Sequence, residues 1–175
     1  DLWLMPAALV TLAIGMVGVL AVKKLDRLVA FSVIGSMGMV MVAIALFTPA
    51  GISAALYYIV HSTLAGAALF LISDLVRTGR NNLELTVQPP VTGAALTAAL
   101  FFAGAIAMVG LPPLSGFLGK LLLLDASFAS PHAVWIWAVV LIASILRRVG
   151  FARDGSVLFW KAESLAPDPE DIESE

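Results

Sequence analysis

The stretch Gly110-Leu-Pro-Pro-Leu-Ser-Gly-Phe-Leu-Gly-Lys120 places a turn rich in glycine and proline, followed by one cation, inside a long apolar segment. Because proline lacks an amide hydrogen, Pro112 and Pro113 leave the carbonyls of Met108 and Val109 without helical partners. In a bilayer, broken backbone is tolerated only where it packs in protein or lines a wet cavity. A lysine at that depth costs about 2.5–3.5 kcal/mol on insertion scales. The combination predicts a path for ions or protons.

The composition predicts an integral membrane protein. Of 175 residues, 61% are hydrophobic and 13% are charged, and the mean hydropathy is +1.01. A water-soluble chain of this length could not cover so much apolar surface, because most of its helices would need a wet face. We therefore expect the lipid bilayer as its surroundings and no nucleic-acid partner. The absence of cysteine excludes disulfides and thiolate metal sites.

The hydropathy pattern predicts an all-α, polytopic bundle of about five transmembrane helices, since stretches of about 18 or more uncharged apolar residues span a bilayer. The helices are expected in a membrane domain, 1–161, and an acidic, disordered tail is expected at 162–175. The expected helices are 2–22, 28–47, 52–76, 92–128 and 133–160. The fourth is expected as a discontinuous helix with halves 92–109 and 117–128, broken between Gly110 and Gly116. A re-entrant second half is the alternative.

The basic residues predict the orientation. With five passes, every Lys and Arg except Lys120 falls on one side, which the positive-inside rule assigns to the cytoplasm. The N-terminus is then outside and the acidic tail cytoplasmic, in the inner membrane of a bacterium or archaeon. Arg147 and Arg148 interrupt the last segment, and we expect their side chains to snorkel to the cytoplasmic surface.

Two residues are candidates for a proton pathway. Lys120 is expected to gain and lose a proton, with burial and neighbouring groups tuning its proton affinity. The alternative is that it snorkels or neutralises a carboxylate such as Asp125 and has no transport role. His61 lies midway along the third segment, where a histidine either relays protons or bonds a neighbouring helix. Three residues are possible contributors, each with a local explanation as well, namely Asp74, which has Arg77 three residues later, and the hydroxyls of Ser62 and Thr63.

The sequence does not carry an enzyme's pattern. It has no nucleophile beside a base, no phosphate-binding loop and no cluster of metal ligands, because only His61 and His132 are available as histidines. We therefore expect no catalytic residue, no metal and no cofactor. The glycines Gly15, Gly18, Gly35 and Gly38 are interpreted as sites of close helix packing.

Two motifs resemble a known family. The stretch Lys24-Leu-Asp-Arg-Leu-Val-Ala-Phe-Ser-Val-Ile-Gly-Ser-Met-Gly38 is similar to the (D/K)-x-K-R-x-L-A-Y-S-S-x-x-x-x-G signature of antiporter-like membrane subunits, and the stretch from Gly110 to Lys120 resembles their broken helix. That family includes subunits of respiratory complex I, of membrane-bound hydrogenases and of Mrp-type cation/proton antiporters. The D subunit of the Mrp branch is the nearest likeness, on 60–76, 119–124 and 155–160.

The resemblance implies that Lys120 and His61 belong to the proton pathway of a multisubunit Na⁺(K⁺)/H⁺ antiporter, with other subunits, protons and a monovalent cation as partners. Sodium is expected in preference to potassium. Ser36 and Ala65 stand where some complex I relatives have a histidine and a lysine, so no relay role transfers to them. The resemblance also implies a fragment from the C-terminal half of a longer subunit, since the chain opens on Asp1 and lacks the family's other essential charges.

Two other functions are compatible with the same residues. The helices would suit an antiporter-like subunit of a proton-pumping NADH-quinone oxidoreductase or of a membrane hydrogenase, in which case the chain would serve redox chemistry performed elsewhere. The missing helices and the pair Arg147 and Arg148 would also suit a truncated assembly protein that does not transport.

Overall fold

The protein is described here by a computed structural model, which places residues 3–88 and 93–161. The described residues form six α-helices and one π-helical turn, which confirms the all-α prediction. They are α1 (Leu4–Ala21), α2 (Leu25–Ile44), α3 (Pro49–Arg80), α4 (Ala94–Val109), α5 (Ser115–Ser127), α6 (Ala133–Gly155) and the π-turn η1 (Ser156–Trp160). The predicted acidic tail, 162–175, lies outside the described residues, as does the expected start of the fourth helix at residue 92.

Two helices differ from their predicted bounds: the second has the predicted length but is shifted by three residues and ends at Ile44, and the third is longer. The second begins at Leu25 rather than at residue 28, so that Asp26 lies in its first turn. The third begins at Pro49 and continues to Arg80. Its N-cap residue is Thr48, whose side chain accepts a hydrogen bond from the Gly51 amide at 3.0 Å. The predicted bounds followed the apolar run, but a helix extends past the hydrocarbon into the interface wherever capping and backbone bonding allow.

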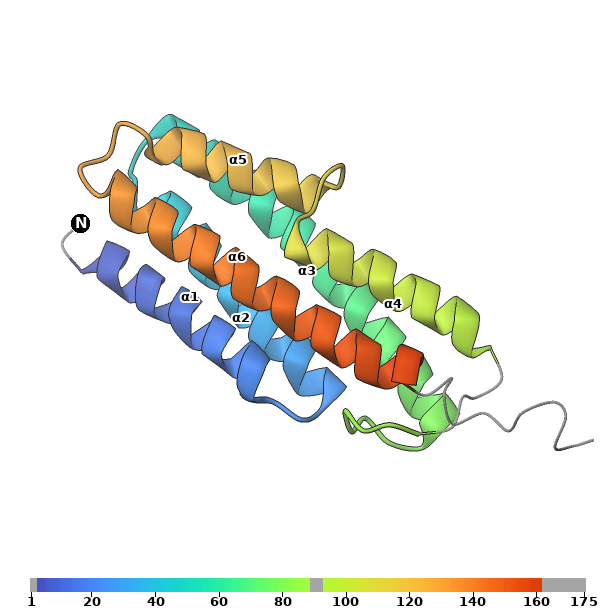
Figure 1. Cartoon of the computed structure of the whole chain (residues 1–175). Coiled ribbons are helices and arrows are strands. Elements are labelled where there is room, and N and C mark those ends of the chain that lie inside the picture. Colours follow the sequence, from blue (N-terminus) through green and yellow to red (C-terminus); the bar gives the residue numbers. More distant parts are fainter. Residues whose placement is uncertain (1–2, 89–92, 162–175) are drawn as a thin grey trace, which may run out of the picture.

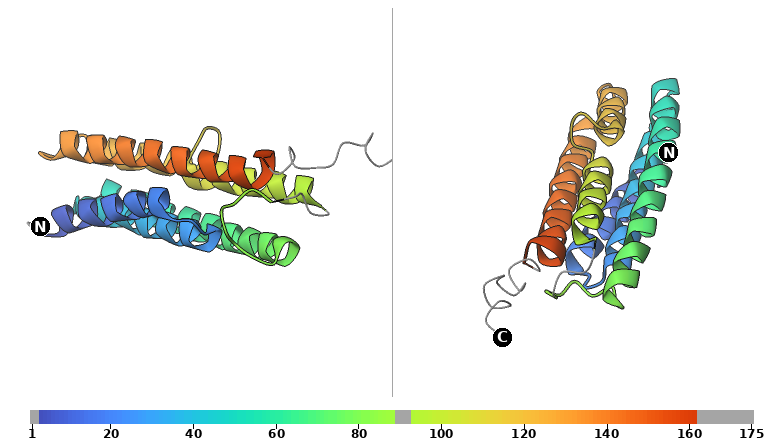
Figure 2. Two further views of the ribbon diagram at one scale, coloured as in Figure 1. Left: turned by 60° about the horizontal axis from the view of Figure 1, so that its bottom comes forward. Right: turned by 90° about the vertical axis from the view of Figure 1, so that its right-hand side faces the viewer.

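The helices pack in two layers. Helices α1, α2 and α3 form one layer, and α4, α5 and α6 form the other (Figures 1 and 2). Four helices in the described part of the chain are long and apolar enough to cross a membrane, namely α1, α2, α3 and α6 together with η1. Helices α4 and α5 follow one another in the same direction along the bundle (Figure 1). Their course matches the discontinuous pass and does not match the re-entrant alternative.

Glycine allows α1 and α2 to approach closely. A Cβ atom built on Gly15 would lie 2.5 Å from the Gly35 amide nitrogen, and one built on Gly38 would lie 2.6 Å from the Leu12 nitrogen. Any side chain at these positions would therefore push the two backbones apart. This contact confirms the interpretation of these glycines as packing sites.

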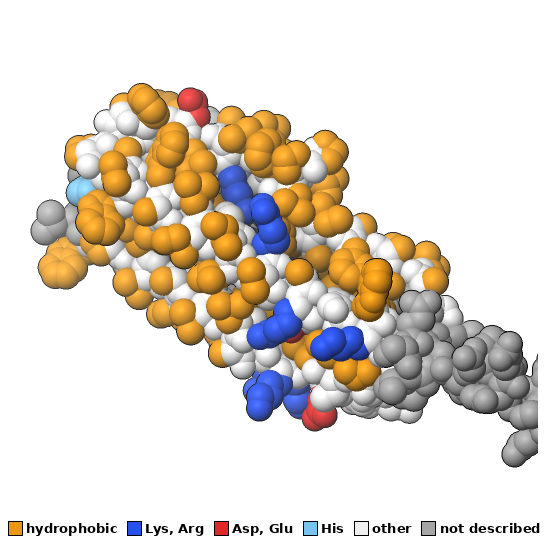
Figure 3. Space-filling view, in the orientation of Figure 1, with side chains coloured by type: hydrophobic (Ala, Val, Ile, Leu, Met, Phe, Trp, Pro, Cys, Tyr) orange, Lys and Arg blue, Asp and Glu red, His pale blue; other side chains and the backbone are white. Residues whose placement is uncertain are grey.

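One end of the bundle is basic and is held together by polar contacts. Lys and Arg side chains gather toward the end at which α6 terminates, while the opposite end of this face is mainly apolar (Figure 3). There the segment after α3 pairs with the α1–α2 loop, since the Leu25 amide bonds the Leu83 carbonyl and the Leu85 amide bonds the Lys23 carbonyl, each at 2.9 Å. The α1–α2 loop, which carries Lys23 and Lys24, and the segment that follows Arg80 thus meet at one end.

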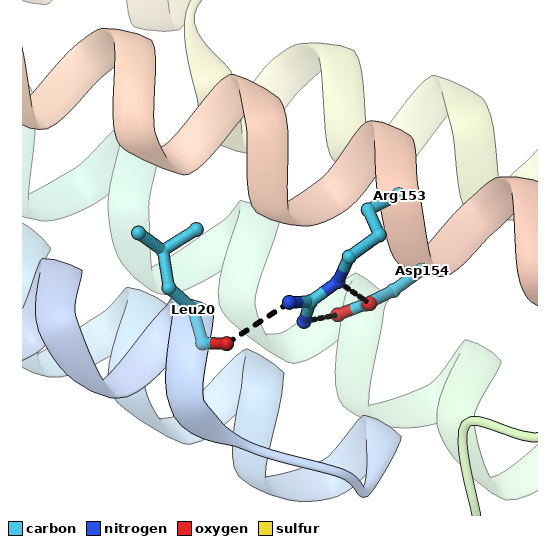
Figure 4. A network of polar contacts seen from close by, with 3 residues as sticks. All are labelled: Leu20, Arg153 and Asp154. Atoms are coloured by element: carbon cyan, nitrogen blue, oxygen red, sulfur yellow. Dashed lines mark hydrogen bonds and ion pairs between the residues drawn. The ribbon is translucent and has the colours of Figure 1, made fainter.

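A second polar contact at this end joins α6 to α1. Arg153 donates to both carboxylate oxygens of Asp154, at 2.6 and 3.2 Å, and its Nη1 donates to the Leu20 carbonyl at 3.0 Å (Figure 4). Asp154 is buried, whereas Arg153 reaches the surface. The arginine therefore neutralises a buried carboxylate and binds a carbonyl at the last turn of α1.

Candidate functional site

The broken end of α4 is closed by backbone geometry and leaves two carbonyls free. Gly110 adopts φ 72°, its amide bonds the Ala107 carbonyl at 3.1 Å, and the Leu111 amide bonds the Ile106 carbonyl at 3.2 Å. This is a Schellman turn, which needs the left-handed conformation that glycine adopts without strain. The carbonyls of Met108 and Val109 take no part in it. They are the two carbonyls that the sequence predicted to be unpaired.

Lys120 binds one of these carbonyls. Its Nζ atom donates to the Val109 carbonyl oxygen, and its side chain is buried in the second turn of α5. The C-terminal end of a helix carries partial negative charge, so the end of α4 stabilises the ammonium ion. Within the described residues no ion pair joins Lys120 to a carboxylate, and Asp125 is exposed. The structure favours the helix break as the partner of Lys120 over the alternative pair with Asp125.

Arg147 binds the other free carbonyl. Its Nη1 atom donates to the Met108 carbonyl at 3.1 Å and to Ser36 Oγ at 3.3 Å, and only 2% of the residue is exposed. The prediction that Arg147 snorkels to the surface is therefore wrong. The side chain turns inward because α6 packs against α2 and α4 at this level, where a freed carbonyl and a hydroxyl both accept hydrogen bonds from Nη1. The Nε atom is buried and has no hydrogen-bond partner among the described residues. Arg148, one residue later, is exposed.

His61 reaches the same break from α3. Its Nδ1 atom lies 2.8 Å from the hydroxyl oxygen of Ser115, the first residue of α5. The other nitrogen, Nε2, is buried, and within the described residues it has no hydrogen-bond partner of good geometry. A Cβ atom on Gly116 would lie 2.7 Å from Nε2 and would also collide with the Ala107 carbonyl oxygen. Gly116 therefore lets the imidazole and the end of α4 approach each other.

The possible contributors do not join this cluster. Ser62 donates to the Ile59 carbonyl of its own helix at 3.3 Å, and Thr63 lies with Ile59, Val60 and Leu64 on an outward-facing hollow of α3. Asp74 pairs with Arg77 at 3.5 Å, and both side chains are about two-thirds exposed. For Ser62 and Asp74, the local explanations therefore account for the contacts seen.

Sequence reasoning missed three residues of the cluster, namely Ser36, Ser115 and Arg147. Ser115 lies inside the quoted break, where a hydroxyl at the start of a half-helix was a usable signal. Ser36 was discounted because the family pattern has a histidine at its position, and Arg147 was expected at the surface. Neither partner was detectable in the sequence, because the bonds of Arg147 join residues 39 and 111 positions apart.

The arrangement suits proton binding rather than bond chemistry. It combines an amine, an imidazole with one free nitrogen, a hydroxyl and the carbonyl end of a broken helix. Across the described ranges, no three His, Cys, Asp or Glu side chains lie together as a metal site would need. An amine held by a single backbone carbonyl can release that carbonyl when it loses its proton, and a histidine can take up and pass on a proton near neutral pH.

Comparison with known proteins places these features in a family. The family described as "NADH:quinone oxidoreductase/Mrp antiporter, TM" matches residues 1–146. The chain is 32% identical to the D subunit of the Na(+)/H(+) antiporter of Bacillus subtilis (strain 168), over 96% of this chain and 34% of the relative. It is 31% identical to the D subunit of a probable K(+)/H(+) antiporter of Rhizobium meliloti (strain 1021), over 90% of this chain and 35% of the relative.

A solved structure agrees with these likenesses. The fold resembles a chain in the structure of the Mrp complex from Dietzia sp. DQ12-45-1b, with a TM-score of 0.79 and 28% identity over 89% of this chain and 30% of that chain. The present sequence thus spans about a third of the length of the curated relatives that it matches.

Proposed function

This chain belongs to the NADH:quinone oxidoreductase/Mrp antiporter transmembrane family, and we propose that it is part of a proton-translocating subunit of a multisubunit Na⁺(K⁺)/H⁺ antiporter. The observation that carries the proposal is the contact between Lys120 and the Val109 carbonyl at the broken end of α4. Relatives named as the D subunits of Na⁺/H⁺ and K⁺/H⁺ antiporters support the assignment. We propose sodium as the exchanged cation and other membrane subunits as partners.

In this mechanism, the protonated amine of Lys120 is held by the α4 carbonyl end, and the neutral amine is released from it. His61, oriented by Ser115, takes up and passes on a proton at the break, where Gly116 lets its imidazole approach the end of α4. The lysine side chain thereby connects the residues of the proton pathway to one side of the membrane in only one of its two protonation states. The basic end of the bundle faces the cytoplasm in this proposal, as the positive-inside rule requires.

The test is Lys120→Ala in the full-length subunit, assembled with its partner subunits and reconstituted into vesicles. Proton flux driven by a sodium gradient is expected to fall to the background level of empty vesicles. Arg77→Ala is the matched control, because it removes an exposed cation far from the break, and it should leave the flux unchanged. Unchanged sodium-dependent proton flux in Lys120→Ala would contradict the proposal.

The family description also covers NADH:quinone oxidoreductases, so a redox-driven pump is the second candidate. The two functions are separated by the driving force in the same vesicles. A sodium gradient alone moves protons through an antiporter, whereas a redox-driven subunit moves them only when an electron donor and quinone are supplied to the complete complex.

A further inference from the structure

Arg147 links three helices at the break. From α6, its guanidinium donates to the Met108 carbonyl of α4 and to the Ser36 hydroxyl of α2. Ser36, which is fully buried, accepts this bond while donating to the Ser32 carbonyl at 3.0 Å. Burying a guanidinium costs free energy unless its N–H groups are hydrogen-bonded. In the described chain Nη1 has these two acceptors, Nε has no partner, and no carboxylate pairs with the group. The two bonds from Nη1 are therefore the polar contacts that tie this side chain to α2 and α4.

The surrounding backbone makes room for the guanidinium. A Cβ atom on Gly35 would lie 3.0 Å from Arg147 Nη2 and would collide with the Met16 side chain, so the absence of a side chain at Gly35 opens the space. The Met108 carbonyl is free to accept this bond because Pro112, four residues later, has no amide hydrogen to donate to it. The same proline break that frees Val109 for Lys120 thus frees Met108 for Arg147.

The two cations differ in what they can do at this helix end. A guanidinium keeps its charge throughout the physiological range, so its contact with the Met108 carbonyl does not depend on pH. A lysine ammonium has three N–H donors and can lose its proton. The Met108 carbonyl that Arg147 binds is next in sequence to the Val109 carbonyl that binds Lys120.

We infer that Arg147 is a positioning residue for Lys120: by occupying the Met108 carbonyl, with Ser36 aligning it, it restricts the lysine to one carbonyl and so allows the amine to leave the helix end. This inference rests on the proposed function of Lys120. Without Arg147, the amine must break two carbonyl bonds instead of one in each cycle. The turnover rate then falls, while entry of the transported cation is unaffected.

The transport test compares Arg147→Met, Arg147→Lys and Ser36→Ala in the full-length subunit with its partner subunits, with rates expressed per assembled complex. Arg147→Met is expected to lower the maximal sodium-driven proton flux about tenfold and to leave the half-saturating sodium concentration unchanged. Arg147→Lys, which keeps one donor for Met108, should recover to within about threefold of the unsubstituted protein. Ser36→Ala should give an intermediate rate and perturbs folding least. Arg77→Met, at an exposed position of α3 away from the break, is the control and should not change the flux.

A second measurement does not depend on transport. Acetic anhydride is reacted with the assembled complex, and modification of Lys120 is followed by peptide mass spectrometry. The second carbonyl should make Lys120 react several-fold more slowly in Arg147→Met than in the unsubstituted protein. If the unsubstituted complex shows no sodium-driven flux, the proposed function fails, and the labelling still decides the role of Arg147. Equal or faster labelling in Arg147→Met, an unchanged maximal flux per complex, or no recovery in Arg147→Lys would overturn the inference.

Discussion

Lys120 and Arg147 bind neighbouring carbonyls of the same helix end, the lysine at Val109 and the arginine at Met108. Each carbonyl is free because a proline stands four residues later in the chain. The Schellman turn on Gly110 satisfies the two carbonyls before them. At this helix end, two carbonyls therefore accept bonds from backbone amides, and the other two accept bonds from the side chains of Lys120 and Arg147.

Gly110→Ala should destabilise the protein, because φ 72° is a left-handed conformation that costs an L-residue about 1–2 kcal/mol. The added Cβ would also lie 2.8 Å from the Gly116 carbonyl carbon and oxygen. Thermal unfolding in detergent measures the loss. Gly93→Ala is the matched control, since Gly93 has φ 81° but no heavy atom within 4 Å of the added Cβ. Equal losses for the two variants would show that crowding at Gly116 contributes nothing.

Ser115→Ala should slow proton flux about fivefold, because it removes the hydrogen bond that orients the His61 imidazole, a contribution of about 1 kcal/mol. Sodium-driven flux in vesicles containing the full-length subunit and its partners checks this. Ser62→Ala provides the comparison, since that hydroxyl lies next to His61 in sequence but bonds only its own helix. Should Ser62→Ala slow the flux as much as Ser115→Ala, the assignment of Ser115 would be wrong.

Arg153→Ala should destabilise the bundle more than Asp154→Asn does. Removing the arginine leaves a carboxylate that is 2% exposed without its partner, which costs about 3–5 kcal/mol. The amide of Asp154→Asn is neutral, and the half-exposed arginine left behind can reach water, so the loss is that of a charged hydrogen bond, about 1.5–3 kcal/mol. Chemical unfolding of the purified protein ranks the two variants. The reverse ranking would show that the buried carboxylate of Asp154 does not depend on Arg153 for its stabilisation.

Asp74→Asn should leave both stability and flux nearly unchanged. Its partner Arg77 is equally exposed, and a surface pair of this kind contributes about 0–1 kcal/mol. Thermal unfolding and vesicle flux, measured on the same preparation, test this. A tenfold lower proton flux in Asp74→Asn, with unchanged stability, would show that Asp74 belongs to the proton pathway.

Local chemistry made much of this protein predictable from its sequence. The apolar runs predict the helices, and the paired prolines predict the break between α4 and α5, because hydropathy and a missing amide hydrogen do not depend on distant residues. The helix ends were predicted less well. Asp26 and Arg80 lie within α2 and α3, outside the predicted ranges 28–47 and 52–76.

By itself, the sequence determined that the chain crosses a membrane, that one crossing is broken, and that the carbonyls of Met108 and Val109 need partners. Only the tertiary structure decided which partners they have. Arg147 lies 39 residues from Met108, and His61 lies 54 residues from Ser115. An arginine in an apolar segment turns toward water or toward buried acceptors according to what packs against it. Here α2 and α4 supply those acceptors, and the side chain points inward.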